Sequence, residues 1–570
     1  MVAPPYLIKI CRKVARRFRR PLPLAFLALA VLILVGGAIY PPSNYTGLQY
    51  RLERILQWLA QGGWWWIHSP NYRMNDRACG IEWMFTPLLW FTKSDRLLFL
   101  VNFIPFLLLP GLIFSVFTQL GIRARVTWQW MWLLPTGYNF LLQAGSIGND
   151  TFPTVFALAA MDFGLRARKS GKNSDLWNSI LAAALLTGAK ASNLPLLLPW
   201  AIAIFPSLPL LRKKIVGTIL ISLIAAAVSF LPNAILNAHF CGDWSGANLE
   251  EPRLAMKNPI VGIYGNFFQF TLDNFAPPIF PMAHWWNEHA PLFMPHFLVA
   301  AADKYFDGGF FALGELPTED WAGIGFGLSI LLVTSLLTTF CRRTGTARAK
   351  EIPLICRLIL VSGWLALLVY CTKSGLTNAA RIIAPYYPLL VASLLVAVRP
   401  EMVRRIWWKI LVGAALISAF VVLILSPDRP LWPAKTILSH LSAHSNSASI
   451  SRPLKVYTTY SQRFDPLAGI RALLPPEIKT IGFMAGPDDM DISLWRPYGS
   501  RIVRHFFVTD SAERIRGQVQ YLVVGGFNLK NQGIAIDDWL QKSGAELAGE
   551  TNATLKVGEG AQPWYVVRFK

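Results

Sequence analysis

The chain has 570 residues, of which 54% are hydrophobic and only 15% charged, and its mean hydropathy is +0.40. Soluble proteins of this size carry roughly a quarter charged residues, so the composition excludes an ordinary soluble domain. The formal charge of +22 would suggest a nucleic-acid partner in a soluble chain. Because much of the basic excess lies in short loops between apolar runs, no nucleic-acid partner is expected here.

The N-terminus is basic and leads into a long apolar run. The stretch KICRKVARRFRR holds seven Lys and Arg residues, and residues 22–40 are apolar. A secretory signal begins in the same way. However, the apolar run is long and no small-residue cleavage site stands out. We therefore interpret it as a retained first span that follows a cytoplasmic segment, 1–21, with a cleaved signal as the alternative.

Residues 44–59, NYTGLQYRLERILQWL, predict an amphipathic helix directly after the first span. The apolar residues recur at spacings of four, three and four: Leu48, Leu52, Ile55 and Leu59. Arg51 and Arg54 fall on the other side of such a helix. The pattern is too polar to cross a bilayer and is typical of a helix that lies along the membrane surface.

The rest of the first long loop interleaves aromatic and charged residues in GGWWWIHSPNYRMNDRACGIEWM, residues 62–84. The polar side chains of this stretch are His68, Arg73, Asp76, Arg77 and Glu82. Tryptophans stack on sugar faces and also populate membrane interfaces, so both interpretations stay open.

Apolar runs long enough to cross a bilayer recur through the first three quarters of the chain. About eleven spans are expected, near residues 22–40, 97–118, 126–142, 151–167, 177–190, 194–210, 215–233, 322–340, 355–371, 381–398 and 407–426. The basic clusters lie at residues 121–125, 166–172, 211–214, 341–350 and 399–409. All of these clusters fall on one side when the spans alternate, which predicts a cytoplasmic N-terminus and an outer C-terminus.

This topology places four segments on the outer face of the membrane: residues 41–95, 144–150, 234–321 and everything after about 427. Asp150 in QAGSIGND then lies at the outer start of the fourth span, where a carboxylate is costly to place. It could act as a general base or hold a divalent ion near a lipid phosphate. The alternative is a helix N-cap formed by Asn149 or Asp150.

Three further charged sites are expected at the same level. Glu319 and Asp320 in LPTEDWAGIGFG precede the eighth span, where the helix dipole would also favour acidic residues. Lys190 in LLTGAKASNLP and Arg381 in TNAARIIAPYYPLL could bind a phosphate, or merely reach the lipid headgroups. Each residue alone is explained by anchorage, whereas their convergence on one face favours a site.

Metal and disulfide signals are weak. His284 and His289 in HWWNEH are five residues apart, a spacing that does not place both imidazoles on one helical face. Among the six cysteines, only Cys79 and Cys241 fall in segments expected outside the cytoplasm, so one disulfide between them is conceivable without further support.

The tail, residues 450–570, predicts a small outer α/β domain that follows a linker at residues 431–449, whose clearest part is SHLSAHSNSAS (439–449). Strand-like runs occur at residues 455–460, 480–485, 501–507, 520–526 and 563–569. A helix-like run occurs at residues 537–547. Such alternation is typical of α/β structure. The domain could brace the membrane part or recognise a substrate.

This pattern resembles the membrane glycosyltransferases of the GT-C fold, and most closely the branch of protein O-mannosyltransferases and aminoarabinose transferases. The resemblance covers residues 22–430. The pieces that carry it, in chain order, are NYTGLQYRLERILQWL, QAGSIGNDTFPTVFALAAMDFGLRAR, LLTGAKASNLPLLLPW, TEDWAGIGFG and ARIIAPYYPLL. It implies an α-helical polytopic membrane protein with a small C-terminal α/β domain.

The resemblance also implies site residues. In that family an acidic residue early in the first outer loop commonly serves as catalytic base, within a pattern that Asn44, Tyr45, Tyr50, Leu52 and Arg54 match. The acidic position is Thr46 and the family's His position is Arg51.

Because a threonine hydroxyl cannot be a base at neutral pH, a nearby carboxylate would have to replace it. The candidates are Glu53, Asp76 and Glu82, and Asp76 is preferred because it lies in a polar loop. Asp150 matches the family's second acidic position, and Lys190 and Arg381 match positions that face the donor's phosphate.

The expected function is transfer of a sugar from a polyprenyl-phosphate donor to a glycan, lipid or protein acceptor on the periplasmic side of a bacterial inner membrane. A divalent cation, Mg or Mn, could take part. The expected catalytic residues are Asp150 and Asp76. The expected substrate-binding residues are Arg381, Lys190, Arg77, Arg73, Glu319, Asp320, Glu82, Tyr50 and Arg54. The alternative, favoured by Thr46, is a non-catalytic scaffold or envelope-assembly subunit of the same architecture, and a transporter is a third reading.

Overall fold

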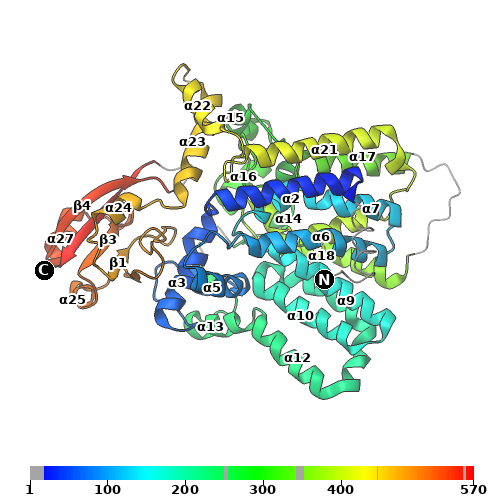
Figure 1. Ribbon diagram of the computed structural model, residues 1–570, viewed down its shortest axis with the longest axis horizontal. Helices are drawn as coiled ribbons and strands as arrows, with labels where there is room; N and C mark the ends of the chain where they lie inside the picture. Colours follow the sequence, from blue (N-terminus) through cyan, green and yellow to red (C-terminus); the bar gives the residue numbers. More distant parts are fainter. Residues whose placement is uncertain (1–17, 250–254, 342–351, 446, 556–559, 570) are drawn as a thin grey trace, which may run out of the picture. The chain divides into compact units, whose positions relative to one another are not determined.

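The computed structural model describes residues 18–249, 255–341, 352–445, 447–555 and 560–569, which form two compact units (Figure 1). The described residues of Met1–Ile39, Phe99–Pro232 and Glu251–Trp432 make up the first unit. Those of Tyr40–Leu98, Asn233–Glu250 and Pro433–Lys570 make up the second. The first long loop of the chain therefore folds with the tail.

The first unit is helical, and its longest helices are apolar enough to cross a membrane. These are α2 (Pro21–Ile39), α6 (Leu100–Gln119), α18 (Leu354–Cys371) and α21 (Ile406–Leu425). The run Ala191–Val228 also meets the length and hydropathy required. Within the described part of the chain, five stretches thus qualify by length and composition, and the predicted count of eleven spans stays a prediction.

Most of the other predicted spans are helices that are short or interrupted, and proline is the commonest cause. Pro135 separates α7 (Ala124–Leu133) from α8 (Tyr138–Ala144) through the 3-10 turn η2 (Leu134–Thr136). The predicted spans 194–210 and 215–233 form one run instead: η3 (Ala191–Leu196), α11 (Leu197–Ile204), η4 (Phe205–Lys214) and α12 (Ile215–Val228). Proline cannot donate the backbone hydrogen bond of a continuing helix, which favours these 3-10 turns.

The remaining helices of the membrane part follow the predicted order. They are α9 (Phe152–Ser170), α10 (Asn173–Ala189), α17 (Phe326–Cys341), α19 (Ala379–Ile382), η6 (Met402–Arg404) and α20 (Tyr387–Leu395). The predicted loop 234–321 holds α14 (Pro259–Asn274), α15 (Ala283–Phe293) and α16 (His296–Tyr305). Figure 1 shows α9 beside α10, and α17 beside α21, as their close packing requires.

An apolar core with many aromatic rings joins these helices. Phe26 of α2 stacks on Phe106 of α6, with ring centroids 5.1 Å apart, and also meets Trp132 of α7. Trp130 and Trp408 are fully buried in the same core. Rings of this size bury large apolar areas, so they fix how α2, α6, α7 and α21 pack.

The connections between helices of the first unit lie at two ends, and contacts between helix ends show which connections share an end. At one end, Lys169 of α9 donates to Gln119 of α6, and Asn173 of α10 donates to the carbonyl of Leu210. At the other end of α6, Asn102 donates to the carbonyls of Ser146 and Gly148. The basic connections 121–125, 166–172 and 211–214 thus gather where α6 and α9 end, whereas QAGSIGND lies where α6 begins. The basic cluster predicted at 341–350 lies outside the described residues from position 342 on.

The second unit begins with helices of the first loop. They are η1, a π-helical turn (Gly47–Arg51), α3 (Leu52–Gln61), α4 (Arg73–Asp76) and α5 (Gly80–Thr92), joined later by the end of α13 (Leu231–Cys241) and by η5 (Ala247–Leu249). The helix predicted at 44–59 is therefore confirmed in type. A helix on the membrane surface would expose its polar face to water, but Arg51 and Arg54 on that face are buried.

The tail contributes a five-stranded mixed sheet with the order β2-β1-β3-β5-β4. Its strands are β1 (Thr480–Met484), β2 (Ile502–His505), β3 (Tyr521–Gly525), β4 (Ala545–Ala553) and β5 (Gln562–Phe569). The central β1 and β3 pair in parallel, with Gly482 opposite Leu522, and both are buried along nearly their whole length. Continuous apolar runs such as TIGFM suit strands covered on both faces. The helices of the tail are α22 (Ala434–Ser442), α23 (Ala448–Arg463), α24 (Ala468–Leu473), α25 (Ala512–Arg516), α26 (Gly526–Asn531) and α27 (Ile536–Ser543).

The α/β character of the tail is confirmed, but three details of the prediction are wrong. Residues 455–460, predicted as a strand, lie inside α23, where the apolar residues keep a helical spacing. The helix predicted at 537–547 ends at Ser543, because Gly544 adopts a left-handed conformation and β4 follows. The predicted linker, residues 431–449, contains all of α22 and the first two residues of α23.

Candidate functional site

Asp150 lies in the short connection between α8 and α9, and its side chain is completely buried. Helix α9 begins at Phe152, so Thr151 and not Asp150 holds the N-cap position, and the Thr151 side chain makes no capping hydrogen bond. The side chain of Asp150 contacts three polar side chains of the first unit instead. The helix-cap alternative is therefore not what the structure shows.

Two cations hold the carboxylate of Asp150. Arg381 Nη1 of α19 lies 2.6 Å from Asp150 Oδ2, and Lys190 Nζ pairs with Asp150 Oδ1. Lys190 directly follows Ala189, the last residue of α10, and is in extended conformation, so the chain leaves the helix there. Ion pairs of this kind are worth the cost of burial only when both partners are also hydrogen-bonded. The three predicted residues Asp150, Lys190 and Arg381 thus come together.

Gln143 of α8 orients this cluster. Its Nε2 donates to Asp150 Oδ2 over 2.7 Å, while its Oε1 accepts from the backbone N–H groups of Asp150 and Thr151. The amide therefore satisfies both the carboxylate and the backbone of the turn. A Cβ on Gly148 would lie only 2.8 Å from Gln143 Oε1, which explains why a glycine suits this position.

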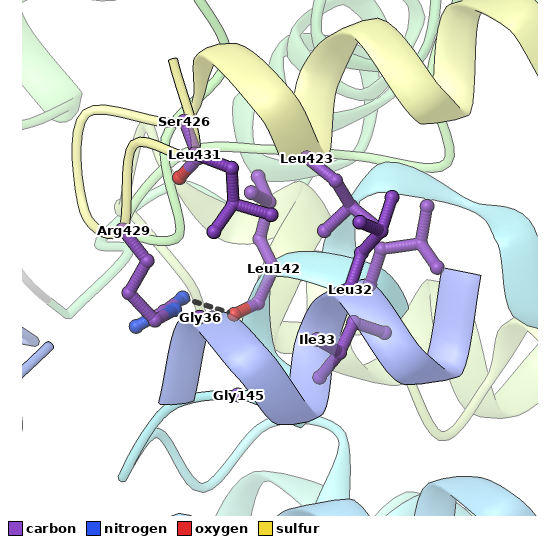
Figure 2. Close-up of a pocket in the computed structure, with 10 residues that line it drawn as sticks. Leu32, Ile33, Gly36, Leu142, Gly145, Leu423, Ser426, Arg429 and Leu431 are labelled. Atoms are coloured by element: carbon purple, nitrogen blue, oxygen red, sulfur yellow. Dashed lines mark hydrogen bonds between the residues drawn. The ribbon is translucent and has the colours of Figure 1, made fainter. Parts of the chain in front are cut away.

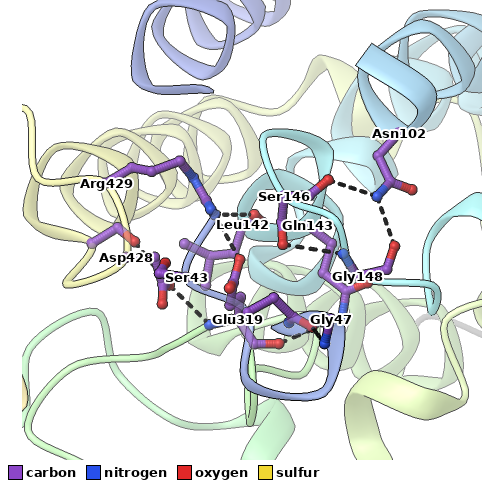
Figure 3. Close-up of polar contacts among 12 residues, drawn as sticks. Ser43, Gly47, Asn102, Leu142, Gln143, Ser146, Gly148, Glu319, Asp428 and Arg429 are labelled. Atoms are coloured by element: carbon purple, nitrogen blue, oxygen red, sulfur yellow. Dashed lines mark hydrogen bonds and ion pairs between the residues drawn. The ribbon is translucent and has the colours of Figure 1, made fainter. Parts of the chain in front are cut away.

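A second buried ion cluster lies beside the first and is drawn in Figure 3. Arg429 Nη2 lies 2.9 Å from Glu319 Oε2 and also donates to the carbonyl of Leu142 (Figure 2). Asp428 Oδ2 accepts from the backbone N–H of Glu319. Gln143 Nε2 lies 3.4 Å from the Glu319 carbonyl, so one amide bridges both clusters.

Close packing of small residues admits Arg429 to this position. The pocket in Figure 2 is lined by residues of α2, of α8 and α21, and of the segments that follow these two helices, among them Gly36 in α2 and Gly145 just after α8. A Cβ on Gly145 would lie 3.2 Å from Arg429 Nε. Burial, together with the neighbouring Glu319 carboxylate, raises the pKa of Asp428 well above its ordinary value.

Glu319 and Asp320 precede the helix of the eighth span, as predicted, but they lie too far from it for the helix-dipole alternative. Helix α17 begins at Phe326, so Glu319 and Asp320 precede its first turn by several residues and do not cap it. Glu319 pairs with Arg429, and Asp320 is buried. Tyrosine hydroxyls fix the neighbouring segments, since Tyr386 donates to the carbonyl of Ser192 and Tyr387 donates to Asn274.

The predicted residues of the first loop belong to the second unit, whereas the Asp150 cluster belongs to the first. Asp76 is buried, with Arg77 Nε 3.7 Å from its Oδ1. Its backbone carbonyl accepts from Asn237, and a Cβ on Gly246 would lie 2.7 Å from its own Cβ. Asp76 is therefore tightly packed on one side.

Three more of these predicted residues form a buried group around Arg54. Arg54 lies 3.5 Å from Glu82 and donates to the carbonyls of Ala78 and Arg73. The guanidinium of Arg54 also lies 5.5 Å from the ring centroid of Tyr50. Burial raises the pKa of Glu82, although Arg54 opposes the shift. This arrangement suits a structural brace, because all three side chains are withdrawn from solvent.

Sequence reasoning missed two groups of the second unit. Arg73 pairs with Asp488 at 2.7 Å, and Gln49 donates to the same carboxylate. His505 is held between Ser69 Oγ at 2.6 Å and Asp491 Oδ2 at 2.7 Å, and all three are buried. In each group a tail residue lies more than 400 positions from its first-loop partner, and no local pattern signals such pairs.

The tryptophans of the first loop line an open groove of the second unit. The residues that line it include Trp58, Trp64, Trp83 and Trp90, together with Gly62 and Gly63. Four indole rings on one groove suit either a sugar face or the membrane interface. Both interpretations of the Trp run stay open.

Nothing in the described residues assembles a metal centre, since no group of three His, Cys, Asp or Glu side chains could hold an ion there. His284 faces Glu288, while His289 contacts the carbonyl of Trp285. Cys79 and Cys241 are free thiols, so the structure contains no disulfide between them. Burial raises the pKa of Cys79 to about 12. The Mg or Mn expectation stays a prediction.

No protein-family profile matches the chain, and no curated protein sequence matches it either. Solved structures do. The crystal structure of ArnT from Cupriavidus metallidurans bound to undecaprenyl phosphate aligns over 95% of this chain and 97% of its own, with a TM-score of 0.50 and 11% identity.

Two other similarities are weaker. The oligosaccharyltransferase of Archaeoglobus fulgidus aligns over 91% of this chain and 70% of its own, with a TM-score of 0.42 and 11% identity. The arabinosyltransferase EmbB of Mycobacterium smegmatis aligns over 72% and 42%, with a TM-score of 0.32 and 14% identity. The fold assignment rests on the first similarity. This chain has the fold of the GT-C membrane glycosyltransferases: a multi-pass helical membrane part with a small α/β domain.

Proposed function

We propose that this protein transfers a sugar from a polyprenyl-phosphate donor to an acceptor hydroxyl at the outer face of the membrane. The observation that carries the proposal is the buried cluster of Asp150, Lys190 and Arg381 on a GT-C fold. The ArnT structure of the same fold was solved with undecaprenyl phosphate, which supports a lipid phosphate as ligand class.

The charges of the cluster suit an anion. Two cations surround one carboxylate, so the three groups carry a net charge of about +1 when all are ionised. The side chain of Arg381 is 6% exposed, whereas that of Lys190 is 20% exposed. Lys190 therefore offers the more accessible charge, while Arg381 is fixed by Asp150.

In the proposed reaction the acceptor oxygen attacks the anomeric carbon, and the bond between that carbon and the phosphate oxygen breaks. The acceptor proton passes to a base, and the lipid phosphate leaves with the bonding electrons. Lys190 and Arg381 would stabilise the charge that develops on this phosphate.

The contacts of Asp150 favour a positioning role over a base. A carboxylate that already accepts from Gln143, Lys190 and Arg381 orients those donors. Asp76 stays the alternative base of the proposal. Thr46 does not serve, because a threonine hydroxyl cannot act as a base at neutral pH; it donates to Asn44 Oδ1 over 3.1 Å.

The test is sugar transfer by the purified full chain in liposomes, with a panel of polyprenyl-phosphate sugars and hydroxyl acceptors. Arg381→Gln and Lys190→Gln should each lower kcat/KM at least 100-fold, as the loss of charge-assisted contacts to a leaving group implies. Lys373→Gln removes an exposed cation next to α18 and should leave transfer unchanged. Transfer at the wild-type rate by both cluster variants would overturn the proposal.

Thr46 keeps a second candidate function open, a non-catalytic scaffold that binds lipid-linked sugars. It occupies the place of the family's first-loop acidic residue, so the usual base is missing at that position. Tight binding of the donor panel without turnover with any acceptor would favour this function.

A further inference from the structure

A cavity opens at the end of the first unit where the basic connections gather. It has a volume of about 300 Å³ and lies between the start of α7, the end of α17 and the segment that leads through η6 into α21. The residues that line it are Arg123, Thr338, Thr339, Arg399, Glu401, Met402, Arg405 and Trp407. Three guanidinium groups therefore share one small cavity.

Neighbouring side chains do not neutralise these charges. Across the described ranges, Arg123, Arg399 and Arg405 form no ion pair or side-chain hydrogen bond with another residue. Glu401 is the sole carboxylate in the lining, so the lining carries about +2. Basic loops at this end of a membrane protein would be expected for topology alone, but topology does not require three arginines to line one cavity.

The backbone adds to the positive potential. Arg123 immediately precedes α7 and Arg405 immediately precedes α21, both in extended conformation and without a side-chain cap. The first N–H groups of a helix lack intrahelical partners and favour an anion. Two helix starts and three guanidinium groups thus converge on the same space.

Apolar surface continues from this cavity along α21. Ile406, Ile410 and Ile417 are 76%, 65% and 66% exposed, and their spacing of four and seven puts them on one face. Exposed isoleucines on a helix long enough to cross a bilayer face lipid chains. Trp407 in the lining is of the type enriched at the headgroup level.

We infer that this cavity binds the headgroup of an anionic glycerophospholipid, with the phosphate among Arg123, Arg399 and Arg405 and the acyl chains along α21. Arginine suits phosphate because its planar fork donates two parallel hydrogen bonds. Basic pockets between membrane helices are known to hold anionic lipid headgroups. The site is distinct in residues from the Asp150 cluster and does not depend on the proposed transfer.

The test uses the delipidated full chain in detergent and measures lipid binding by native mass spectrometry. Phosphatidylglycerol should bind, and phosphatidylethanolamine with the same acyl chains should bind at least tenfold more weakly. Arg405→Gln and Arg123→Gln should each weaken phosphatidylglycerol binding about fivefold to tenfold. The matched controls are Arg404→Gln and Arg125→Gln, which remove the same charge from adjacent residues outside the lining and should change binding less than twofold.

Several results would overturn the inference. Equal binding of both lipids would show an ordinary acyl-chain surface, and equal losses in Arg404→Gln and Arg405→Gln would show a diffuse charge effect. Competition by inorganic phosphate at the lipid's own concentration would indicate a soluble anion. One-for-one displacement of phosphatidylglycerol by undecaprenyl phosphate would indicate a donor site instead. A second readout is thermal stability, which phosphatidylglycerol should raise in the wild type and leave unchanged in Arg405→Gln.

Discussion

Replacement of Asp150 by asparagine removes a charge while keeping the shape and one hydrogen-bonding oxygen. The carboxylate is fully buried and pairs with Arg381 at 2.6 Å and with Lys190. After the change the buried Arg381 and the partly buried Lys190 remain side by side without their counter-ion. The protein should therefore lose stability even if nothing else moves.

The size of the loss can be bounded from the structure. Charges whose centres lie about 4 Å apart attract by about 4 kcal/mol at an effective dielectric constant of about 20. Removal of one partner of a buried pair costs about 3–5 kcal/mol in measured cases. Asp150→Asn should lower the free energy of unfolding by a similar amount, about 3 kcal/mol or more.

A double-mutant cycle isolates the pair. Arg381→Gln alone leaves Asp150 paired with Lys190, and the double variant Asp150→Asn with Arg381→Gln removes opposite charges together. The double variant should be more stable than the sum of the two losses by about 1–3 kcal/mol. Arg166→Gln is the control, since the Arg166 side chain is half-exposed and the buried Asp162 keeps its hydrogen bonds from Ser115 and Gln119, so the loss should be less than about 1 kcal/mol.

The measurement is reversible unfolding in mixed detergent micelles, followed by tryptophan fluorescence. Additive losses in the double variant would show that Asp150 and Arg381 do not interact as described. A loss below about 0.5 kcal/mol in Asp150→Asn would contradict the argument from burial, because a buried Arg381 without its carboxylate partner should destabilise the protein by more than that.

Three other variants test separate parts of the structure. Gly148→Ala should lower stability by about 1–3 kcal/mol and disturb the Asp150 turn, since the new Cβ would lie 2.8 Å from Gln143 Oε1, and thermal unfolding reports the loss. Asp428→Asn should stabilise the protein at neutral pH and remove part of the pH dependence of unfolding, which a pH series of unfolding curves measures. Because the folded-state pKa of Asp428 is raised, the protonated carboxyl contributes its full stability to the folded state below the ordinary value of 3.8. This contribution is lost as the pH rises through the folded-state pKa. His505→Ala should cost about 1–3 kcal/mol, because it leaves a buried carboxylate and a hydroxyl without their shared partner, and limited proteolysis of the tail should accelerate.

The controls for these variants lie in the same chain. Gly111→Ala in α6 meets nothing within 4 Å and should be neutral or slightly stabilising, so an equal loss there would contradict the steric argument. An unchanged pH profile in Asp428→Asn would contradict its raised pKa. His68→Ala changes a half-exposed imidazole, and a loss as large as that of His505→Ala would contradict the burial argument.

Local patterns predicted elements well wherever the pattern itself decides the structure. The strands at 480–484 and 521–525 follow short apolar runs that suit a buried sheet, and the strand at 502–505 alternates exposed and buried residues, as a strand at a sheet edge does. The run at 455–460 also reads as a strand, but its aromatic and β-branched residues pack equally well on a helix, and α23 takes them. Propensity is a weak guide where tertiary packing can accept both forms.

The candidate site divides in the same way. Convergence of Asp150, Lys190 and Arg381 followed from alternating spans and charges at one level of the membrane. The same reasoning could not identify Gln143 and Arg429, because their roles depend on which helix ends come into contact. The burial of Arg51 and Arg54 has a related cause: helical periodicity indicates only that they share a polar face, whereas folding with the rest of the second unit buries both.

Equilibrium binding of undecaprenyl phosphate to the detergent-purified chain tests directly whether Lys190 and Arg381 bind a lipid phosphate. Arg381→Gln and Lys190→Gln should each raise Kd at least tenfold, while Lys373→Gln should change it less than twofold. An unchanged Kd in both cluster variants would contradict the claim that these cations receive the donor's phosphate.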